Sequence, residues 1–148
     1  MNLNFNNTAY DSLYLESMMS VHALVFSKLF ALKKEYDIFS MIDVYMQHSE
    51  IRSRMDVGNW SALNKGWKQI FNSIDFSLCK PKLEDYPVDD ILLGWIAHIY
   101  VLLQWRYNIS SSILNQKLPS KVLCEMYNPL HETSYENACE KLYNKFIV

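Results

Sequence analysis

Residues 87–107 read PVDDILLGWIAHIYVLLQWRY, and this stretch decides the fold that the sequence predicts. The run Ile91–Leu103 within it carries no charge and is apolar at nearly every position. A helix that is apolar all round is either the buried centre of a globular fold or a membrane span. The run is shorter than the ~18 apolar residues typical of a span, and it contains His98, which we expect to be a neutral, hydrogen-bonded core histidine. We therefore predict a buried central helix over about residues 88–107, with other helices packed around it.

The composition fits long helices joined by short loops. Half of the 148 residues are apolar and 14% are aromatic, whereas glycine and proline occur only 3 and 4 times. This length suits one domain with a proper core, and the scarcity of turn residues argues against an all-β protein. We predict an all-α fold, a single compact helical domain of about seven or eight helices around the central helix.

One passage has the composition of a linker. Ser77–Pro87, SLCKPKLEDYP, holds two of the four prolines, and prolines among polar residues mark loops. We predict that this linker, residues 77–87, joins two helical subdomains of the fold. The N-terminal subdomain covers residues 1–76, and the C-terminal subdomain, residues 88–148, contains the central helix.

Side chains that cap helices predict where the other helices begin. A first long helix is expected from Asp11 or Ser12 to about Glu35. Further starts are expected at Asp37, Ser49, Ser61, Ser110, Pro119–Ser120 and Thr133, the last with Glu136 as a capping box. The helix after Ser61 is expected to break or bend at Gly66.

The charge balance limits the class of partner, and the cysteines indicate the cellular compartment. Fourteen basic residues against sixteen acidic ones leave a formal charge of −2. A nucleic-acid binder usually has a basic excess or a basic face, so the balance does not favour one, although a local patch is left open. The first residues, MNLNFNNTAYDS, show neither a signal peptide nor a membrane anchor, and three widely spaced cysteines are typical of a reducing interior. We expect a cytoplasmic protein that does not bind a membrane.

The sequence has no pattern typical of a metal site or a catalytic centre. Zinc ligands come in close local pairs, and neither C-x-x-C nor H-x-x-x-H occurs in the chain. Cys124 and Cys139 lie at apolar helix positions, where a free cysteine behaves as a small hydrophobe. His131, expected at a helix start, is the best single candidate for a functional polar group, since loops often carry function. We predict no metal and no cofactor.

The most distinctive polar stretch is DVGNWSALNKGWKQIFNSIDF, residues 56–76. Together with His131, basic, amide and aromatic residues in and just before it form the predicted partner-binding set: Arg52, Arg54, Asn59, Trp60, Lys65, Trp67 and Lys68. Such a set suits a nucleic-acid backbone with stacked bases or the acidic surface of a protein partner. A solvated face with the tryptophans turned inward is a further interpretation. Of the two functional interpretations we favour the protein partner, because Trp, Tyr and Arg dominate interface hot spots and the net charge is negative.

The C-terminal third, from about residue 90 to 145, contains the segments IAHIYVLLQ, NISSSIL and VLCEMYNPLHETSYENACEKL. With Tyr127-x-x-Leu130-His131 as its core, this part resembles small uncharacterised helical proteins of low-GC Gram-positive bacteria and their mobile elements. Some of those proteins are encoded beside toxin-like genes, so the resemblance implies an antitoxin, immunity or phage-associated inhibitory role. Members often have Thr after the histidine, where this chain has Glu132, and the resemblance assigns no catalytic residue.

These observations lead to three hypotheses from different classes. The first is a non-enzymatic protein that binds and occludes another protein, which would be a toxin, a nuclease or another defence component. The second is a nucleic-acid-binding accessory protein that uses the basic and aromatic region 52–68. The third is an enzyme centred on His131. The sequence leaves a homodimer open.

Overall fold

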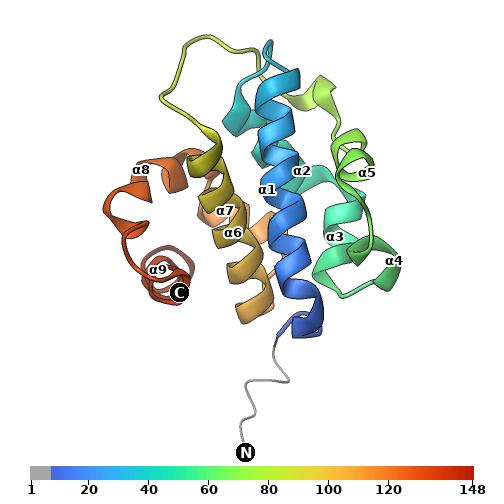
Figure 1. Cartoon of the computed structure of the whole chain (residues 1–148), viewed down its shortest axis with the longest axis vertical. Coiled ribbons are helices and arrows are strands. Elements are labelled where there is room, and N and C mark those ends of the chain that lie inside the picture. The colour runs from blue at the N-terminus through green and yellow to red at the C-terminus, as the bar shows by residue number, and fades with distance from the viewer. Residues whose placement is uncertain (1–7) are drawn as a thin grey trace, which may run out of the picture.

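The computed structural model describes residues 8–148, and within that range the chain is all-α and contains no β-strand (Figure 1). Nine helices follow one another along the described chain: α1 (Leu15–Leu32), α2 (Ile38–His48), α3 (Glu50–Asp56), α4 (Trp60–Leu63), α5 (Trp67–Asn72), α6 (Asp90–Tyr107), α7 (Ser111–Lys117), α8 (Ser120–Leu130) and α9 (Tyr135–Leu142). Short 3-10 turns at Ser12–Tyr14 and Phe76–Leu78 and a π-helical turn at Tyr143–Ile147 complete the helical elements. The prediction of a compact all-α fold is confirmed.

Helix α6 occupies the centre of the fold, as its apolar sequence predicts. The Asp89 carboxylate caps the helix by accepting the backbone N–H of Leu92 at 2.8 Å. Asn108 ends the helix in the left-handed conformation, with a φ of 50°, which asparagine tolerates better than most residues. The buried residues of α6 are Leu92, Leu93, Trp95, Ile96, Ala97, Ile99, Tyr100, Val101, Leu103 and Gln104. The burial of this apolar surface is the main contribution that holds the neighbouring helices to α6.

The burial of α6 is incomplete on one face. Ile91, at the start of the helix, is 73% exposed, and His98 is half-buried rather than in the core. Nδ1 of His98 forms a hydrogen bond with the Tyr135 hydroxyl at 2.8 Å, and partial burial lowers the pKa of this histidine. The prediction that His98 is a core histidine is therefore wrong, because α9 packs on this face and covers it only in part.

Helix α1 runs alongside α6, and these two helices form the most extensive contact in the fold (Figure 1). The buried residues of α1 are Met18, His22, Val25, Phe26 and Leu29. Residues from both sides of the predicted linker belong to one hydrophobic cluster. As far as they are described, residues 1–76 and 88–148 thus share one core across the contact between α1 and α6.

Residues 79–89, which include most of the predicted linker, form no helix but are held against the fold. The backbone N–H of Asp37 donates to the carbonyl oxygen of Lys80 at 2.9 Å. The backbone N–H of Lys82 donates to the carbonyl oxygen of Glu35 at 2.9 Å. These bonds attach the segment to the turn between α1 and α2.

One helical stretch, Ser12–Leu32, is long and apolar enough to cross a membrane by length and composition, with a mean hydropathy of 1.3. In the fold, 28% of its most apolar window is buried, and its inner face packs on α6 and α5. Because helices in the cores of soluble proteins reach similar values, a single stretch of this kind is weak support for a membrane span.

Three predicted capping residues are confirmed. Asp37, Ser49 and Ser110 each accept a backbone N–H at the start of α2, α3 and α7, respectively. Gly66 also separates two helices, α4 and α5, as predicted. In each case the local sequence was sufficient, because a short polar side chain or a glycine directly precedes the first residue of the helix.

Other predicted boundaries are wrong by a few residues. Helix α4 is capped by Asn59 rather than by Ser61, and α9 is capped by Ser134 rather than by Thr133. The first long helix ends at Leu32, earlier than expected. Where two capping residues lie close together, the local sequence does not decide which of them accepts the N–H.

Candidate functional site

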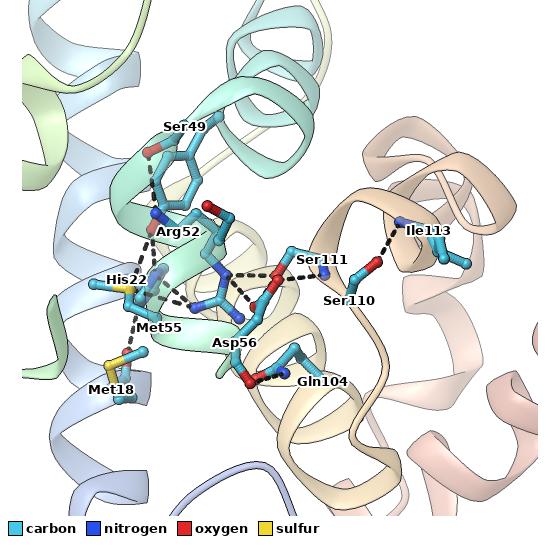
Figure 2. A network of polar contacts seen from close by, with 12 residues as sticks. Met18, His22, Ser49, Arg52, Met55, Asp56, Gln104, Ser110, Ser111 and Ile113 are labelled. Carbon is cyan, nitrogen blue, oxygen red and sulfur yellow. Dashed lines mark hydrogen bonds and ion pairs between the residues drawn. The ribbon is translucent and has the colours of Figure 1, made fainter. Parts of the chain in front are cut away.

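The structure does not bring all the predicted partner-binding residues to one surface. Arg52, the first of them, lies in the core (Figure 2). Arg52 is 0% exposed, since it shares the inner face of α3 with Met55 and Asp56. Arg52 Nε donates to the Ser111 hydroxyl at 2.7 Å and forms an ion pair with Asp56 Oδ1 at 3.6 Å. The prediction that Arg52 contacts a partner at the surface is therefore wrong.

His22 of α1 faces Arg52 (Figure 2). Its contacts define one tautomer of a neutral imidazole. Nδ1 of His22 lies 2.7 Å from the Met18 carbonyl oxygen, which can only accept, so Nδ1 carries the proton. Nε2 lies 3.2 Å from Arg52 Nη1, which can only donate, so Nε2 accepts. Burial, and secondly the Arg52 charge, lowers the pKa of His22 to about 3.

Asp56 connects this group of residues to α7 and α6. Its carboxylate accepts the Ser111 backbone N–H at 2.8 Å and the Ser111 hydroxyl at 2.7 Å. Its carbonyl oxygen accepts the side-chain amide of Gln104 at 3.4 Å. We call Arg52, His22, Asp56 and Ser111 the Arg52 network. Because its charges are buried against each other, the network joins helices and offers no binding surface.

A second polar group between helices centres on Asp43 of α2, which is half-buried. It accepts Asn115 Nδ2 at 2.8 Å and the Ser120 backbone N–H at 3.1 Å, and burial raises its pKa. Neither group was predicted from the sequence. The available signal was a polar residue inside an apolar helical run, such as His22 or Asp43, but this signal does not identify the partner of the residue.

Arg54, Val57, Asn59 and Trp60 gather at the turn between α3 and α4, and we call this exposed surface the Trp60 face. Trp60 is 70% exposed and Val57 is 79% exposed, which is unusual for large apolar side chains. Arg54 Nη2 donates to Asn59 Oδ1 at 3.2 Å. The same oxygen caps α4 by accepting the Ala62 N–H at 3.0 Å, so the guanidinium is held beside the helix that begins with the tryptophan.

Gly58 sets the turn that carries the Trp60 face. Its φ of 74° lies in the left-handed region that favours glycine. A Cβ at this position would also lie 3.3 Å from the carbonyl oxygen of Ala9. The backbone conformation and the available space both favour glycine, and they fix the direction in which the chain enters α4.

Trp67 belongs to a continuous row of four aromatic rings on and beside α5. It packs edge to face on Phe71, with ring centroids 5.9 Å apart. The Phe71 centroid lies 5.8 Å from that of Phe76, and Tyr36 stacks on Phe76 at 5.5 Å. Trp67 is thus half-buried and partly turned inward, unlike Trp60.

Three lysine ammonium groups lie over this row of rings. Lys28 Nζ is 5.0 Å from the Trp67 ring centroid, and Lys68 Nζ is 5.9 Å from it. Lys33 Nζ is 4.6 Å from the Phe76 centroid. At these distances the ammonium is attracted to the ring face. We call these three lysines and four rings the lysine–aromatic strip.

The other predicted residues lie outside these two surfaces. Lys65 is half-buried in the turn between α4 and α5. His131 follows α8, and α8 and α9 pack on the opposite side of α1 and α6 from α3, α4 and α5 (Figure 1). Nδ1 of His131 donates to the Tyr127 carbonyl oxygen at 2.7 Å, and the two rings stack at 4.0 Å. A catalytic role requires several polar side chains that converge on the histidine. The contacts of His131 within residues 8–148 are instead with a backbone carbonyl and a tyrosine ring.

A pocket of about 560 Å³ lies between the end of α1, the start of α2 and the segment before α6. Phe30, Ile38 and Met41 contribute apolar lining. Its charged lining residues carry both signs: Lys33, Lys34, Lys82, Asp37, Glu84, Asp85, Asp89 and Asp90. This mixture points to no single class of ligand, and His131 does not line the pocket.

The part of the chain that the structure describes offers no metal site and no activated cysteine. No three His, Cys, Asp or Glu side chains within it are placed to hold a metal ion. Burial raises the pKa of Cys139 to about 12 and that of Cys79 to about 11, and burial also raises the pKa of Cys124. Because the thiolate is the reactive form of cysteine, these thiols are poor nucleophiles near neutral pH.

Comparison of the chain with protein-family models, with curated proteins and with solved structures found no match. The fold and the exposed surfaces therefore define only a class, an all-α protein with one exposed tryptophan face and one basic, aromatic strip. The resemblance of the C-terminal third to small proteins of mobile elements stays a prediction.

Proposed function

We propose that this chain is a non-enzymatic protein that acts by binding another protein through the Trp60 face. The observation that carries this proposal is the 70% exposure of Trp60, on a turn held by Gly58 and Asn59. Burial of a tryptophan on binding removes a large apolar surface from water. Tryptophan and arginine also dominate the hot spots of protein interfaces, and Arg54 stands beside Trp60.

The proposed mechanism is occlusion of a site on the partner. Trp60 fills or covers that site, while Arg54 contacts polar groups around it. A guanidinium has five N–H donors, and the bond to Asn59 involves only its Nη2 group. Because this bond holds Arg54 in place in the free protein, less side-chain entropy is lost when the complex forms.

The resemblance of the C-terminal third supports a toxin, a nuclease or another defence component as the partner. The role would then be that of an antitoxin, an immunity protein or a phage-type inhibitor. We place this role in the cytoplasm, because Cys79, Cys124 and Cys139 are all free and unpaired thiols are typical of a reducing compartment.

The test measures the affinity of a double variant, Trp60→Ala with Arg54→Ala, for a purified partner. The partner is first captured with the tagged chain, identified by mass spectrometry and produced separately, because capture alone does not establish a specific complex. We expect the double variant to bind at least about 100-fold more weakly, since each hot-spot residue contributes about 2 kcal/mol or more. The far-UV circular dichroism spectrum should not change.

The matched control replaces an exposed leucine and an exposed lysine elsewhere, Leu83→Ala with Lys141→Ala. This control should bind the purified partner as the wild-type chain does. Equal affinity of the Trp60 and Arg54 double variant and the wild-type chain would refute the proposal. A purified partner that proved to be a second copy of the chain would assign the Trp60 face to a homodimer.

A nucleic-acid-binding role is the second candidate, and the lysine–aromatic strip favours it. Basic groups combined with aromatic side chains are typical of grooves that bind single strands. The test is retention of the purified chain on single-stranded DNA over a range of salt concentrations. A nucleic-acid role predicts retention that falls steeply as salt rises, and absence of retention at low salt would exclude it.

A further inference from the structure

The lysine–aromatic strip holds its positive charges in defined places. Lys28 lies over Trp67, and Lys33 lies over Phe76 and, at 6.0 Å, over Phe71. A lysine that rests on a ring face has fewer conformations in the free protein than a fully solvated one. It therefore loses less side-chain entropy when an anion binds to it. The strip is thus preorganised for a negatively charged ligand.

The cations of the strip have no carboxylate partner within residues 8–148. The ion pairs of this part of the chain are Arg52–Asp56 and Lys82–Asp85. Asp37 and Asp75, which adjoin strip residues in the sequence, each turn a carboxylate oxygen to a backbone N–H at the start of the helical turn that follows, and Glu35 takes part in neither ion pair. The strip therefore presents positive charge on a molecule whose formal net charge is −2, and an acidic ligand would complement it.

The arrangement of the rings decides between two kinds of acidic ligand. Phe76 has Tyr36 stacked at 5.5 Å and the Lys33 ammonium at 4.6 Å from its centroid. Trp67 has both Lys28 and Lys68 over its ring. A nucleobase needs an open ring face on which to stack, whereas a carboxylate needs only the ammonium group.

We propose that the lysine–aromatic strip binds an acidic segment of the protein partner. Carboxylates of that segment would contact Lys28, Lys33 and Lys68, while the Trp60 face supplies the apolar contact. This inference rests on the proposed function, because it names the chemistry of the same partner. It also assigns Trp67 and Phe76 the role of holding lysines in place rather than of stacking on a ligand.

The test uses the full chain and two labelled probes of about twelve units, a Glu/Ser peptide and an oligo-dT strand, followed by fluorescence anisotropy at low and high salt. The peptide should bind the wild-type chain more tightly than the strand does. The triple variant Lys28→Gln, Lys33→Gln and Lys68→Gln should bind the peptide at least about tenfold more weakly. Arginine at the same three positions keeps the charge and should restore binding, which separates loss of charge from loss of fold.

The matched control removes the same charge from three exposed lysines elsewhere: Lys80→Gln, Lys141→Gln and Lys145→Gln. It should bind the peptide within about twofold of the wild-type chain. Equal loss in both triple variants would show that only total charge matters and would overturn the inference. Absence of peptide binding at low salt would overturn it too, as would tighter binding of the strand.

The purified partner distinguishes failure of this inference from failure of the proposed function. If replacement of Trp60 and Arg54 weakens the complex but the triple lysine variant does not, the strip is not part of the interface and the inference alone fails. If the triple variant weakens the complex but the double variant does not, the Trp60 face is not the anchor and the proposed function fails as stated.

Discussion

Arg52 shows how a charged residue can belong to the interior of a helical fold. Its guanidinium contacts Asp56 from its own helix, Ser111 from α7 and His22 from α1. A buried ion pair adds little net stability compared with a well-packed apolar pair, but removal of one partner leaves a buried charge uncompensated. The stability of the contact among these three helices therefore depends on every residue of the Arg52 network.

This dependence can be measured with Asp56→Ala. The substitution leaves the Arg52 charge buried without a carboxylate, so we expect the free energy of unfolding to fall by about 3–5 kcal/mol in urea titrations. Arg52→Met combined with Asp56→Ala removes both charges and should be more stable than Asp56→Ala alone. The matched control, Asp85→Ala, removes the acid of an exposed pair and should change stability little. A loss no larger than that of the control would contradict the buried ion pair.

The neutral state of His22 predicts a dependence of stability on pH. The pKa of His22 is about 3 in the folded chain, first because of burial and second because of the Arg52 charge, against 6.5 for an ordinary histidine. Between these two values the unfolded chain binds more protons. Stability should therefore decrease as the pH falls below about 6.5, by up to about 1.4 kcal/mol per pH unit. Asp43, whose pKa is raised by burial, acts in the opposite direction at lower pH.

Urea titrations at several pH values between about 7.5 and 5 check this prediction for the wild-type chain and for His22→Gln. Glutamine keeps one donor and one acceptor but does not titrate, so the variant should show a smaller slope of stability against pH. The half-buried His98 also has a lowered pKa, and His98→Gln serves as the comparison. Equal slopes for the wild-type chain and His22→Gln would mean that folding does not lower the pKa of His22.

At the scale of helices, the start of α4 determines where Trp60 stands. Asn59 accepts the Ala62 N–H and also receives the Arg54 guanidinium, so a single side chain both caps the helix and orders the neighbouring surface. Ser61, the cap that the sequence predicted, is exposed and lies inside the helix instead. The two residues therefore allow a direct comparison of a true cap with a near neighbour.

We expect Asn59→Ala to lower the free energy of unfolding by about 1 kcal/mol, the usual cost of a lost N-cap. Ser61→Ala should leave it nearly unchanged, because an exposed serine inside a helix adds little to stability. Urea titrations followed by circular dichroism give both values. If Ser61→Ala destabilised the chain more than Asn59→Ala, the helix would begin at Ser61 as the sequence alone suggested.

The sequence predicts features of the elements that depend on neighbours in the chain. Asp37, Ser49 and Ser110 were identified as caps because the groups they bind are two or three residues away. The burial of Arg52 could not be predicted in this way, because His22 and Ser111 lie far from it in the sequence. The same limit applies to the lysine–aromatic strip, in which Lys28 of α1 and Lys33, which directly follows α1, meet rings that come later in the chain.

At the scale of the molecule, one hydrophobic cluster includes residues from before and after the predicted linker. The contact between α1 and α6 is the most extensive one between these two parts, and α2 adds a further contact with α7. A separate subdomain would have to expose its side of this contact to water, at a cost of roughly 25 cal/mol for each Å² of apolar surface. Residues 79–89 join the two parts but do not hold them apart, since backbone hydrogen bonds attach this segment to the turn after α1.

The described chain should therefore unfold as one cooperative unit. In urea, far-UV circular dichroism, which follows helices, and tryptophan fluorescence, which follows the surroundings of Trp67 and Trp95, should give coincident transitions. Fragments 1–78 and 88–148, produced separately, should each lack stable helical structure, because each exposes half of the contact between α1 and α6. Two separated transitions, or a fragment that unfolds cooperatively by itself, would show that the linker predicted from the sequence divides two independent folding units.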